Sequence, residues 1–307
     1  MNLQNPKNGS KLPSRYFAKP PKRYLPYYLK YRYKMKFLTF LSSIFLLIQC
    51  SLTKNTESNS KNFKLDTLTY FDQVRIRKIP IAIYQPKNLN ISNNIPIIFS
   101  HGYGENNGKD YLEAYNYLSE FLASKGYFVV SIQHELKTDE LLPMTGKLQE
   151  TRRPNWERGA QNIYFILDKM KTDYKNLNYG KLALIGHSNG GDMTVLFAHK
   201  YPNLVNKIIS MDNRRMELPR TAKPKIYTLR SKEYPADEGI LPTDKEKEEF
   251  GITIDFTKIN HSNMDNDANP EEREYLTKKI LEYLKQKKIR QITQVAVAQL
   301  PFLENSF

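Results

Sequence analysis

One serine of the chain, Ser188, lies in the segment GHSNGG at residues 186–191, between a mostly apolar run and a second run with helical spacing. A Gly-x-Ser-x-Gly spacing between a strand and a helix is typical of a nucleophile elbow. In that turn the serine backbone is strained, and glycine at the flanking positions avoids clashes that larger side chains would make. Ser188 is therefore a candidate nucleophile, raised above one edge of a sheet. The alternative is a glycine-rich turn whose serine only caps the helix.

A serine nucleophile needs a general base, and histidine is the usual one. The chain has five histidines, which are His101, His134, His187, His199 and His261. The last of them, in KINHSNMDND, follows the last expected strand and precedes the last expected helix. In a mostly parallel sheet this loop returns to the edge that carries the serine, and the chain order Ser, Asp, His also places the base late. We therefore predict His261 as the base, with a helix-capping histidine as the alternative.

The third group must be an acid that orients the imidazole, and two residues fit. Asp212, in IISMDNRR, follows the strand after the elbow, and Asp237, in SKEYPADEG, follows the next strand. Both loops end at the same edge of the sheet. The residues alone leave the choice open, and the aspartate that is not the acid is expected to be a solvated or turn-forming carboxylate.

The loop FSHGYGENNG, residues 99–108, follows another expected strand and is placed to complete an oxyanion hole. Such a hole combines the backbone N–H after the nucleophile with one from an earlier loop. We therefore predict the backbone N–H groups of Tyr103 and Asn189 as its donors, with His101 as a buttress of the loop. The alternative is a plain strand-to-helix turn.

Alternating strand and helix patterns predict an α/β protein with a doubly wound, mostly parallel sheet and helices on both faces. The first two strands are expected to be antiparallel. The last helix should begin with Asn269 as N-cap and Pro270 at its first position. We expect a loop at residues 136–156 that is a candidate for a small lid. Trp156 and Met144 in it would suit an acyl pocket, with plain packing as the alternative. Strands are expected at 63–72, 74–86, 95–100, 127–133, 181–186, 206–210, 225–230 and 252–259, and helices at 111–126, 157–171, after Ser188 and at 270–288.

Over roughly residues 65–288 the chain resembles the α/β-hydrolase superfamily. It looks most similar to the platelet-activating-factor acetylhydrolases and the dienelactone-hydrolase-like esterases. The motifs that carry the resemblance are FSHGYG, LASKGYFVVSIQHE, GHSNGG, ISMDNRRMELP and NHSNMDN. The acetylhydrolase pattern favours Asp212 over Asp237 as the acid. The resemblance also implies hydrolysis of a small-molecule ester without a metal or an organic cofactor. The chain departs from the pattern at Asn189, where many relatives have an apolar residue.

Net charge argues against nucleic acid as a partner, although the chain of 307 residues carries a formal +15. Residues 1–36 contain ten Lys or Arg and no acid, so subtracting them from +15 leaves about +5. The excess therefore lies in the leader and not in the expected domain, which has no zinc-finger or RNP-like motif. The acidic segment 265–272 lacks the glycine of a calcium loop, so no metal site is expected there.

A short apolar segment ends at the chain's single cysteine, Cys50. Residues 35–50, MKFLTFLSSIFLLIQC, are too few to span a bilayer and suit a signal peptide. The LIQC ending resembles a bacterial lipoprotein signal, in which the cysteine is lipidated. A signal peptide without lipid and a permanent N-terminal anchor are the alternatives.

The leader interpretation divides the chain into five parts. They are a basic extension at 1–34, which is either disordered or an overlong start that precedes a true first residue at Met35, a signal at 35–50, a linker at 51–62, a hydrolase domain at 63–288 and a tail at 289–307. The prediction is an exported serine esterase, monomeric and anchored to the membrane by lipid on Cys50. A peptidase or acyl-aminopeptidase on the same fold and a non-catalytic surface binding lipoprotein are the alternatives.

Overall fold

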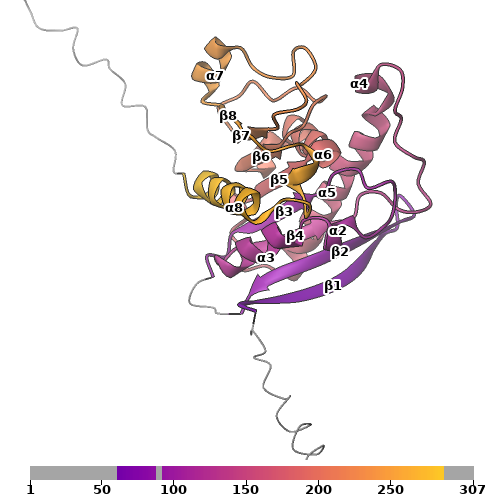
Figure 1. Ribbon diagram of the computed structural model, residues 1–307. Helices are drawn as coiled ribbons and strands as arrows, with labels where there is room; N and C mark the ends of the chain where they lie inside the picture. Colours follow the sequence, from indigo (N-terminus) through magenta and orange to yellow (C-terminus); the bar gives the residue numbers. More distant parts are fainter. Residues whose placement is uncertain (1–60, 88–91, 287–307) are drawn as a thin grey trace, which may run out of the picture. The chain divides into compact units, whose positions relative to one another are not determined.

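An eight-stranded sheet organises the residues that the computed structural model describes, which are 61–87 and 92–286 (Figure 1). The expected basic extension, the signal with Cys50, most of the linker and the tail lie outside these residues. Within the described ranges, no helix is both long and apolar enough to cross a membrane. Along the sheet the strand order is β1-β2-β4-β3-β5-β6-β7-β8. The strands are β1 Phe63–Asp72, β2 Arg77–Pro86, β3 Pro96–Ser100, β4 Phe128–Ile132, β5 Ala183–His187, β6 Lys207–Met211, β7 Lys225–Arg230 and β8 Thr253–Phe256.

Strand direction divides the sheet into an antiparallel border and a parallel centre. The first two strands pair antiparallel, and β2 pairs antiparallel with β4. All pairs from β4 to β8 are parallel. The central strands β3, β4 and β5 are buried along their whole length, as expected for continuous apolar runs covered on both faces. Parallel order brings the carboxyl ends of β3 to β8 to one edge of the sheet.

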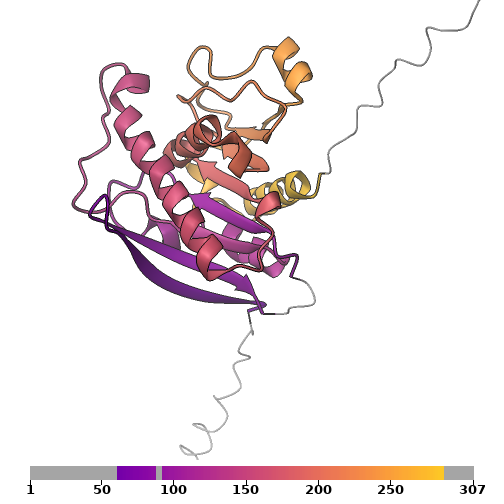
Figure 2. The ribbon, with the colours of Figure 1, turned by 180° about the vertical axis from the view of Figure 1, so that it is seen from behind.

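Helices cover both faces of the sheet, which confirms the doubly wound α/β prediction. On one face α5 (Arg153–Asp173) and α6 (Ser188–Lys200) pack with strand side chains such as Ile98 into one apolar cluster. On the other face α3 (Asn116–Ser124) and α8 (Pro270–Lys285) pack with the neighbouring Ile97. Figure 2 shows α5 in front of the sheet, while α8 lies on the side that faces the viewer in Figure 1. Shorter elements are α2 Asp110–Glu113, α4 Leu148–Thr151, α7 Asp244–Phe250 and the 3₁₀ turns Tyr179–Lys181, Pro202–Leu204 and Ser262–Met264.

Two segments differ from the sequence prediction. The helix expected at 111–126 is broken between α2 and α3, because Tyr115 leaves the helical conformation with φ −138° and ψ 27° and buries its ring. The loop expected at 136–156 instead contains α4 and the first turn of α5, where a proline stands at a position that favours helix initiation. Trp156 is consequently a fully buried helix residue, whereas Met144 is 62% exposed.

The start of α8 follows the prediction, and it yields a test of the fold. Asn269 accepts a hydrogen bond from the N–H of Glu272, whose carboxylate accepts one from the N–H of Asn269. Asn269→Ala removes this N-cap and should lower the free energy of unfolding by about 1 kcal/mol in urea titrations. Lys278→Ala, at an exposed position of the same helix, is the control. An equal effect of both substitutions would contradict the capping assignment.

Candidate active site

The turn between β5 and α6 holds Ser188 in a strained conformation with φ 52°. A Cβ atom on Gly186 would come within 2.3 Å of the carbonyl oxygen of Gly190, and one on Gly190 would come within 2.2 Å of that of His101. Such approaches are sterically forbidden, so both flanking positions require glycine. The close approach of these carbonyl groups explains why the motif has glycine on both sides of the serine. Because Ser188 directly follows β5, its hydroxyl lies at the carboxyl edge of the sheet.

His261 and Asp212 form a continuous hydrogen-bonded chain with this serine. The distance from Ser188 Oγ to His261 Nε2 is 2.9 Å, and that from His261 Nδ1 to Asp212 Oδ2 is 2.6 Å. An ionised carboxylate can only accept, so Nδ1–H donates to Asp212 and Nε2 is left to accept the serine proton. The structure therefore brings together one residue each from α6, from the loop after β6 and from the loop after β8.

Asp212 is fully buried and directly follows β6, with φ 54°. Burial alone would raise the pKa of this carboxyl. The hydrogen bond from His261, the guanidinium of Arg230 and the N–H of Ser231 together outweigh burial and lower the pKa to about 2. The Arg230 nitrogen lies 3.0 Å from Asp212 Oδ1, and the Ser231 N–H donates to the same oxygen at 3.0 Å. Asp212 therefore remains an anion at neutral pH.

The second candidate acid has a different environment. The N–H of Asp237 donates to the carbonyl oxygen of Arg214, and within the described ranges its carboxylate makes no hydrogen bond or ion pair with His261. The geometry thus pairs the histidine with Asp212. Arg230, at the carboxyl end of β7, was not singled out from the sequence. A basic residue at a strand end next to a buried acid is the signal that could have found it.

The other histidines have structural partners. His101 donates from Nδ1 to the carbonyl oxygen of Gly102 and accepts from the N–H of His134, so it buttresses the loop after β3, as expected. His199 bonds the carbonyl oxygen of Glu217. His187, inside the elbow, is bonded to the hydroxyl of Tyr115, as described next.

The loop after β3 lies directly beside Ser188. A Cβ atom on Gly102 would be 3.5 Å from that of Ser188. The hydroxyl of Tyr115 accepts the N–H of Gly102 at 3.2 Å and contacts Nδ1 of His187 at 2.6 Å. Burial, followed by the charge of His261, lowers the pKa of His187 to about 3, so this ring stays neutral beside the site.

The backbone N–H groups of Tyr103 and Asn189 are the donors predicted for an oxyanion hole. No hydrogen bond occupies the N–H of Tyr103 within residues 61–87 and 92–286, and its side-chain hydroxyl accepts from the N–H of Leu142. Asn189 follows the nucleophile in the first turn of α6, where backbone N–H groups have no partner inside the helix. Both positions are therefore compatible with donation to a ligand oxygen.

A buried polar cluster fixes the side chain of Asn189, and sequence reasoning did not predict it. Trp156 Nε1 donates to Asn189 Oδ1 at 2.8 Å. Asn189 Nδ2 donates to Glu135 Oε1 at 3.0 Å and to Asn155 Oδ1 at 2.9 Å. Trp156 is thus a buried packing residue and a hydrogen-bond donor behind the elbow, which agrees with the packing alternative and not with a role in an acyl pocket. The departure of Asn189 from the apolar residue of many relatives was the available signal.

The arrangement can transfer a proton from a hydroxyl to an imidazole that is held in one tautomer by an anion. Such a serine oxygen can attack an electrophilic carbon. Within the residues described, no cluster of three or more His, Cys, Asp or Glu side chains is arranged to hold a metal ion.

Comparison with known proteins identifies the fold. No family model matches the chain, and no curated protein matches its sequence. Among solved structures, the esterase Est22 has a TM-score of 0.57 at 11% identity, covering 74% of this chain and 82% of that chain. A fungal esterase from Rhizomucor miehei gives 0.54 at 14%, covering 74% and 84%. A bacterial heroin esterase gives 0.52 at 15%, covering 79% and 89%.

These likenesses, together with the sheet order and the strand–turn–helix at Ser188, establish the class. The chain has the α/β-hydrolase fold. The solved structures that it resembles include several esterases, at sequence identities that establish the fold alone.

The lowered pKa of Asp212 predicts a pH-dependent contribution to stability. The pKa falls from the ordinary 3.8 to about 2 on folding, so the unfolded chain binds this proton more tightly. The stabilisation is present above about pH 5 and is lost as the pH falls through about 2, with a size of about 2 kcal/mol. Urea unfolding of the unmodified protein and of Asp212→Asn should show a stability difference that shrinks by about this amount between those pH values. Asp168→Asn, on an exposed face of α5, is the control, and a difference that stays constant would contradict the assignment.

Proposed function

We propose that the protein is a serine hydrolase that cleaves carboxylic esters of small molecules. The single observation that carries the proposal is the hydrogen-bonded chain from Ser188 Oγ through His261 to the buried, ionised Asp212. The esterases among the structural neighbours support the same reaction class.

In the proposed mechanism Ser188 Oγ attacks the acyl carbon while His261 Nε2 takes its proton. The C–O bond of the ester then breaks, and His261 returns the proton to the leaving alkoxide. Water attacks the acyl-enzyme by the same route, releasing the carboxylic acid and restoring the serine. Asp212 keeps the ring in the Nδ1–H tautomer and stabilises the imidazolium that forms.

The N–H groups of Tyr103 and Asn189 are proposed to bind the oxyanion of each tetrahedral intermediate. Removing one donor from such a hole typically costs about 10²- to 10³-fold in kcat. The fixed side chain of Asn189 supports this role, because its hydrogen bonds to Glu135, Asn155 and Trp156 hold the first turn of α6 in one position. No residue in these steps requires a metal or an organic cofactor.

The sequence of the leader supports a proposed location. Export directed by residues 35–50, followed by lipidation of Cys50, would place the enzyme on the outer side of the cytoplasmic membrane, in the periplasm or at the cell surface. We propose that it acts there as a monomer. The motif similarity to platelet-activating-factor acetylhydrolases adds esters with short or oxidised acyl chains as the substrates to test first.

Substitution of the proposed nucleophile tests the reaction. Ser188→Ala and His261→Ala should lower kcat for p-nitrophenyl esters by about 10⁴- to 10⁶-fold with unchanged circular dichroism. His199→Ala should remain active, because this ring only bonds the carbonyl of Glu217. A fluorophosphonate probe should label the protein but not Ser188→Ala. Labelling that survives in this variant would contradict the assignment.

The same assay separates the two candidate acids and the rival functions. Asp212→Asn should lower kcat by about 10⁴-fold, and Asp237→Asn should retain activity within a few-fold. A panel of p-nitrophenyl esters against aminoacyl anilides distinguishes an esterase from a peptidase. Complete absence of probe labelling in the unmodified protein would favour the non-catalytic binding lipoprotein.

Mass spectrometry of the exported protein tests the anchor. A lipidated chain should begin at Cys50 with the added mass of acyl groups, and Cys50→Ser should move the protein from the membrane to the soluble fraction. A mature protein that retains residues 1–34 would rule out this processing.

A further inference from the structure

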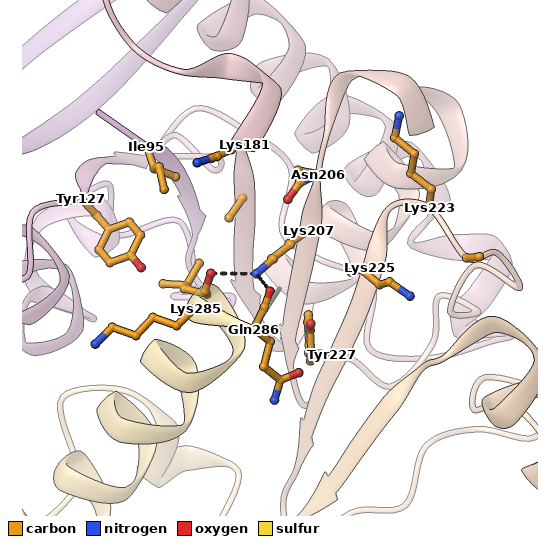
Figure 3. Close-up of a pocket in the computed structure, with 13 residues that line it drawn as sticks. Ile95, Tyr127, Lys181, Asn206, Lys207, Lys223, Lys225, Tyr227, Lys285 and Gln286 are labelled. Carbon is orange, nitrogen blue, oxygen red and sulfur yellow. Dashed lines mark hydrogen bonds between the residues drawn. The ribbon is translucent and has the colours of Figure 1, made fainter. Parts of the chain in front are cut away.

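A cavity of about 580 Å³ lies where the parallel strands begin, at the edge of the sheet opposite Ser188 (Figure 3). Its walls come from the first residues of β5, β6 and β7, the segments before β3 and β4, and the end of α8. The thirteen lining residues include no Asp or Glu. Five lysines line it, here called the lysine edge, which are Lys181, Lys207, Lys223, Lys225 and Lys285.

One of these lysines has a structural partner. Lys207 donates hydrogen bonds to the carbonyl oxygens of Tyr283, Leu284 and Gln286 at 2.8, 2.7 and 2.7 Å. Its ammonium group therefore caps the C-terminal end of α8. Figure 3 shows two of these hydrogen bonds as dashed lines.

The other four lysines of the edge make no salt bridge and no side-chain hydrogen bond with any other residue in the described ranges. They therefore add positive charge around the rim of the cavity, and no carboxylate among the described residues lies within ion-pair distance of them. Two nearly buried tyrosines, Tyr127 and Tyr227, complete the polar walls, and burial raises the pKa of both hydroxyl groups. Neutral hydroxyl donors beside several ammonium groups suit an anion with several oxygen atoms, such as a phosphate group.

The described chain begins close to this cavity. The first residue of β1, Phe63, pairs with Pro86, and the register between β2 and β4, continued by two residues, sets Pro86 beside Tyr127 of the cavity wall. Two strand spacings, about 10 Å, therefore separate Phe63 from that wall. Cys50 precedes Lys61 by eleven residues. A linker of that length reaches about 40 Å when fully extended and about 18 Å as a flexible coil.

The C-terminal segment is a poor occupant of the cavity on grounds of charge. It leaves the domain at Gln286, which lines the cavity, and continues with Lys287, Lys288 and Arg290 before its first acid, Glu304. By sequence this segment is basic near its start, so it offers no nearby carboxylate to neutralise the lysines.

We propose that the lysine edge is a docking surface for the phosphate groups of anionic phospholipids. It would turn the edge that receives the chain from Cys50 toward the bilayer. The proposal goes beyond the ester hydrolysis proposed above, and it uses the lipidation of Cys50 only to explain which edge faces the membrane.

Docking in this way has a consequence for the active site. A basic surface attracts anionic lipid and strengthens anchoring by acyl chains. Strands of five residues separate the lysine edge from the edge with Ser188 by about 17 Å. The nucleophile would therefore open away from the bilayer, and ester substrates would reach it from water.

Fluorescence quenching tests the docking surface in the full chain. Cys50→Ser removes the natural thiol and the lipid, and Ala222→Cys places a single fluorophore at the exposed rim of the cavity. Vesicles of equimolar phosphatidylglycerol and phosphatidylcholine that carry a lipid quencher should quench this label, and salt should weaken the effect. A label at Glu238→Cys, in the loop after β7 at the opposite edge, should be quenched little. The comparison separates docking by the lysine edge from general attraction by the basic leader.

Charge removal supplies the matched comparison. Replacing Lys181, Lys225 and Lys285 by glutamine should lower the affinity for the anionic vesicles, measured by quenching of the cavity label, about 100-fold. This corresponds to roughly fivefold for each lysine. The control replaces three exposed lysines at the opposite edge by glutamine and should leave quenching unchanged. These are Lys109, Lys137 and Lys258.

Four results would overturn the proposal. They are equal quenching of the two labels, equal effects of the two lysine sets, equal binding to pure phosphatidylcholine, and the same fluorescence response to inorganic phosphate alone. Absence of quenching with all lysines present would also overturn it. The two-label comparison needs no lysine substitution, so it stands even where the triple variant fails to fold. Ester hydrolysis by the same proteins is measured separately, so loss of docking and lack of esterase activity are distinguishable.

Discussion

Close packing of backbone around Ser188 is the constraint on which the candidate site depends. The carbonyl oxygen of Gly190 fills the space beside Gly186, and that of His101 fills the space beside Gly190. Side chains at either position would separate the elbow from the loop after β3. That loop reaches the elbow because β3 and β5 are neighbouring parallel strands. The position of Ser188 and that of the proposed oxyanion hole therefore depend on the same sheet order and the same two glycines.

Among the described residues, the buried charge at one edge of the sheet is paired, and four lysine charges at the other edge are unpaired. At the carboxyl edge, the buried Asp212 is matched by Arg230, by the N–H of Ser231 and by His261, which together favour its ionised form. A buried carboxylate with these partners gives the imidazole a fixed orientation. At the opposite edge, the lysines remain without a described counter-charge. One edge therefore holds the ring of His261 in a fixed orientation, and the other presents these unpaired lysines, which is the difference on which the docking proposal rests.

Much of the architecture could be predicted, because the spacing of apolar residues along the sequence indicates which positions are buried. The short apolar runs at β3 and β5 were predictable as buried strands, and both are buried at every position. The Asn269 cap was readable because a capping box is a local interaction. The break at Tyr115 was not readable, since it follows from a hydroxyl that reaches His187, 72 residues away in the chain.

The sequence by itself determined the fold class, the strained turn at Ser188 and the late histidine, because each depends on local spacing or on chain order. Only the tertiary structure decided between Asp212 and Asp237, which follow consecutive strands and look equivalent along the chain. The turn at Asp212 directs its carboxylate to His261, whereas the Asp237 loop folds back onto Arg214. The hydrogen bonds around Asn189 likewise join residues up to 54 positions apart. Periodicity indicates which residues are buried, but which buried polar groups meet depends on strand register and on the paths of loops.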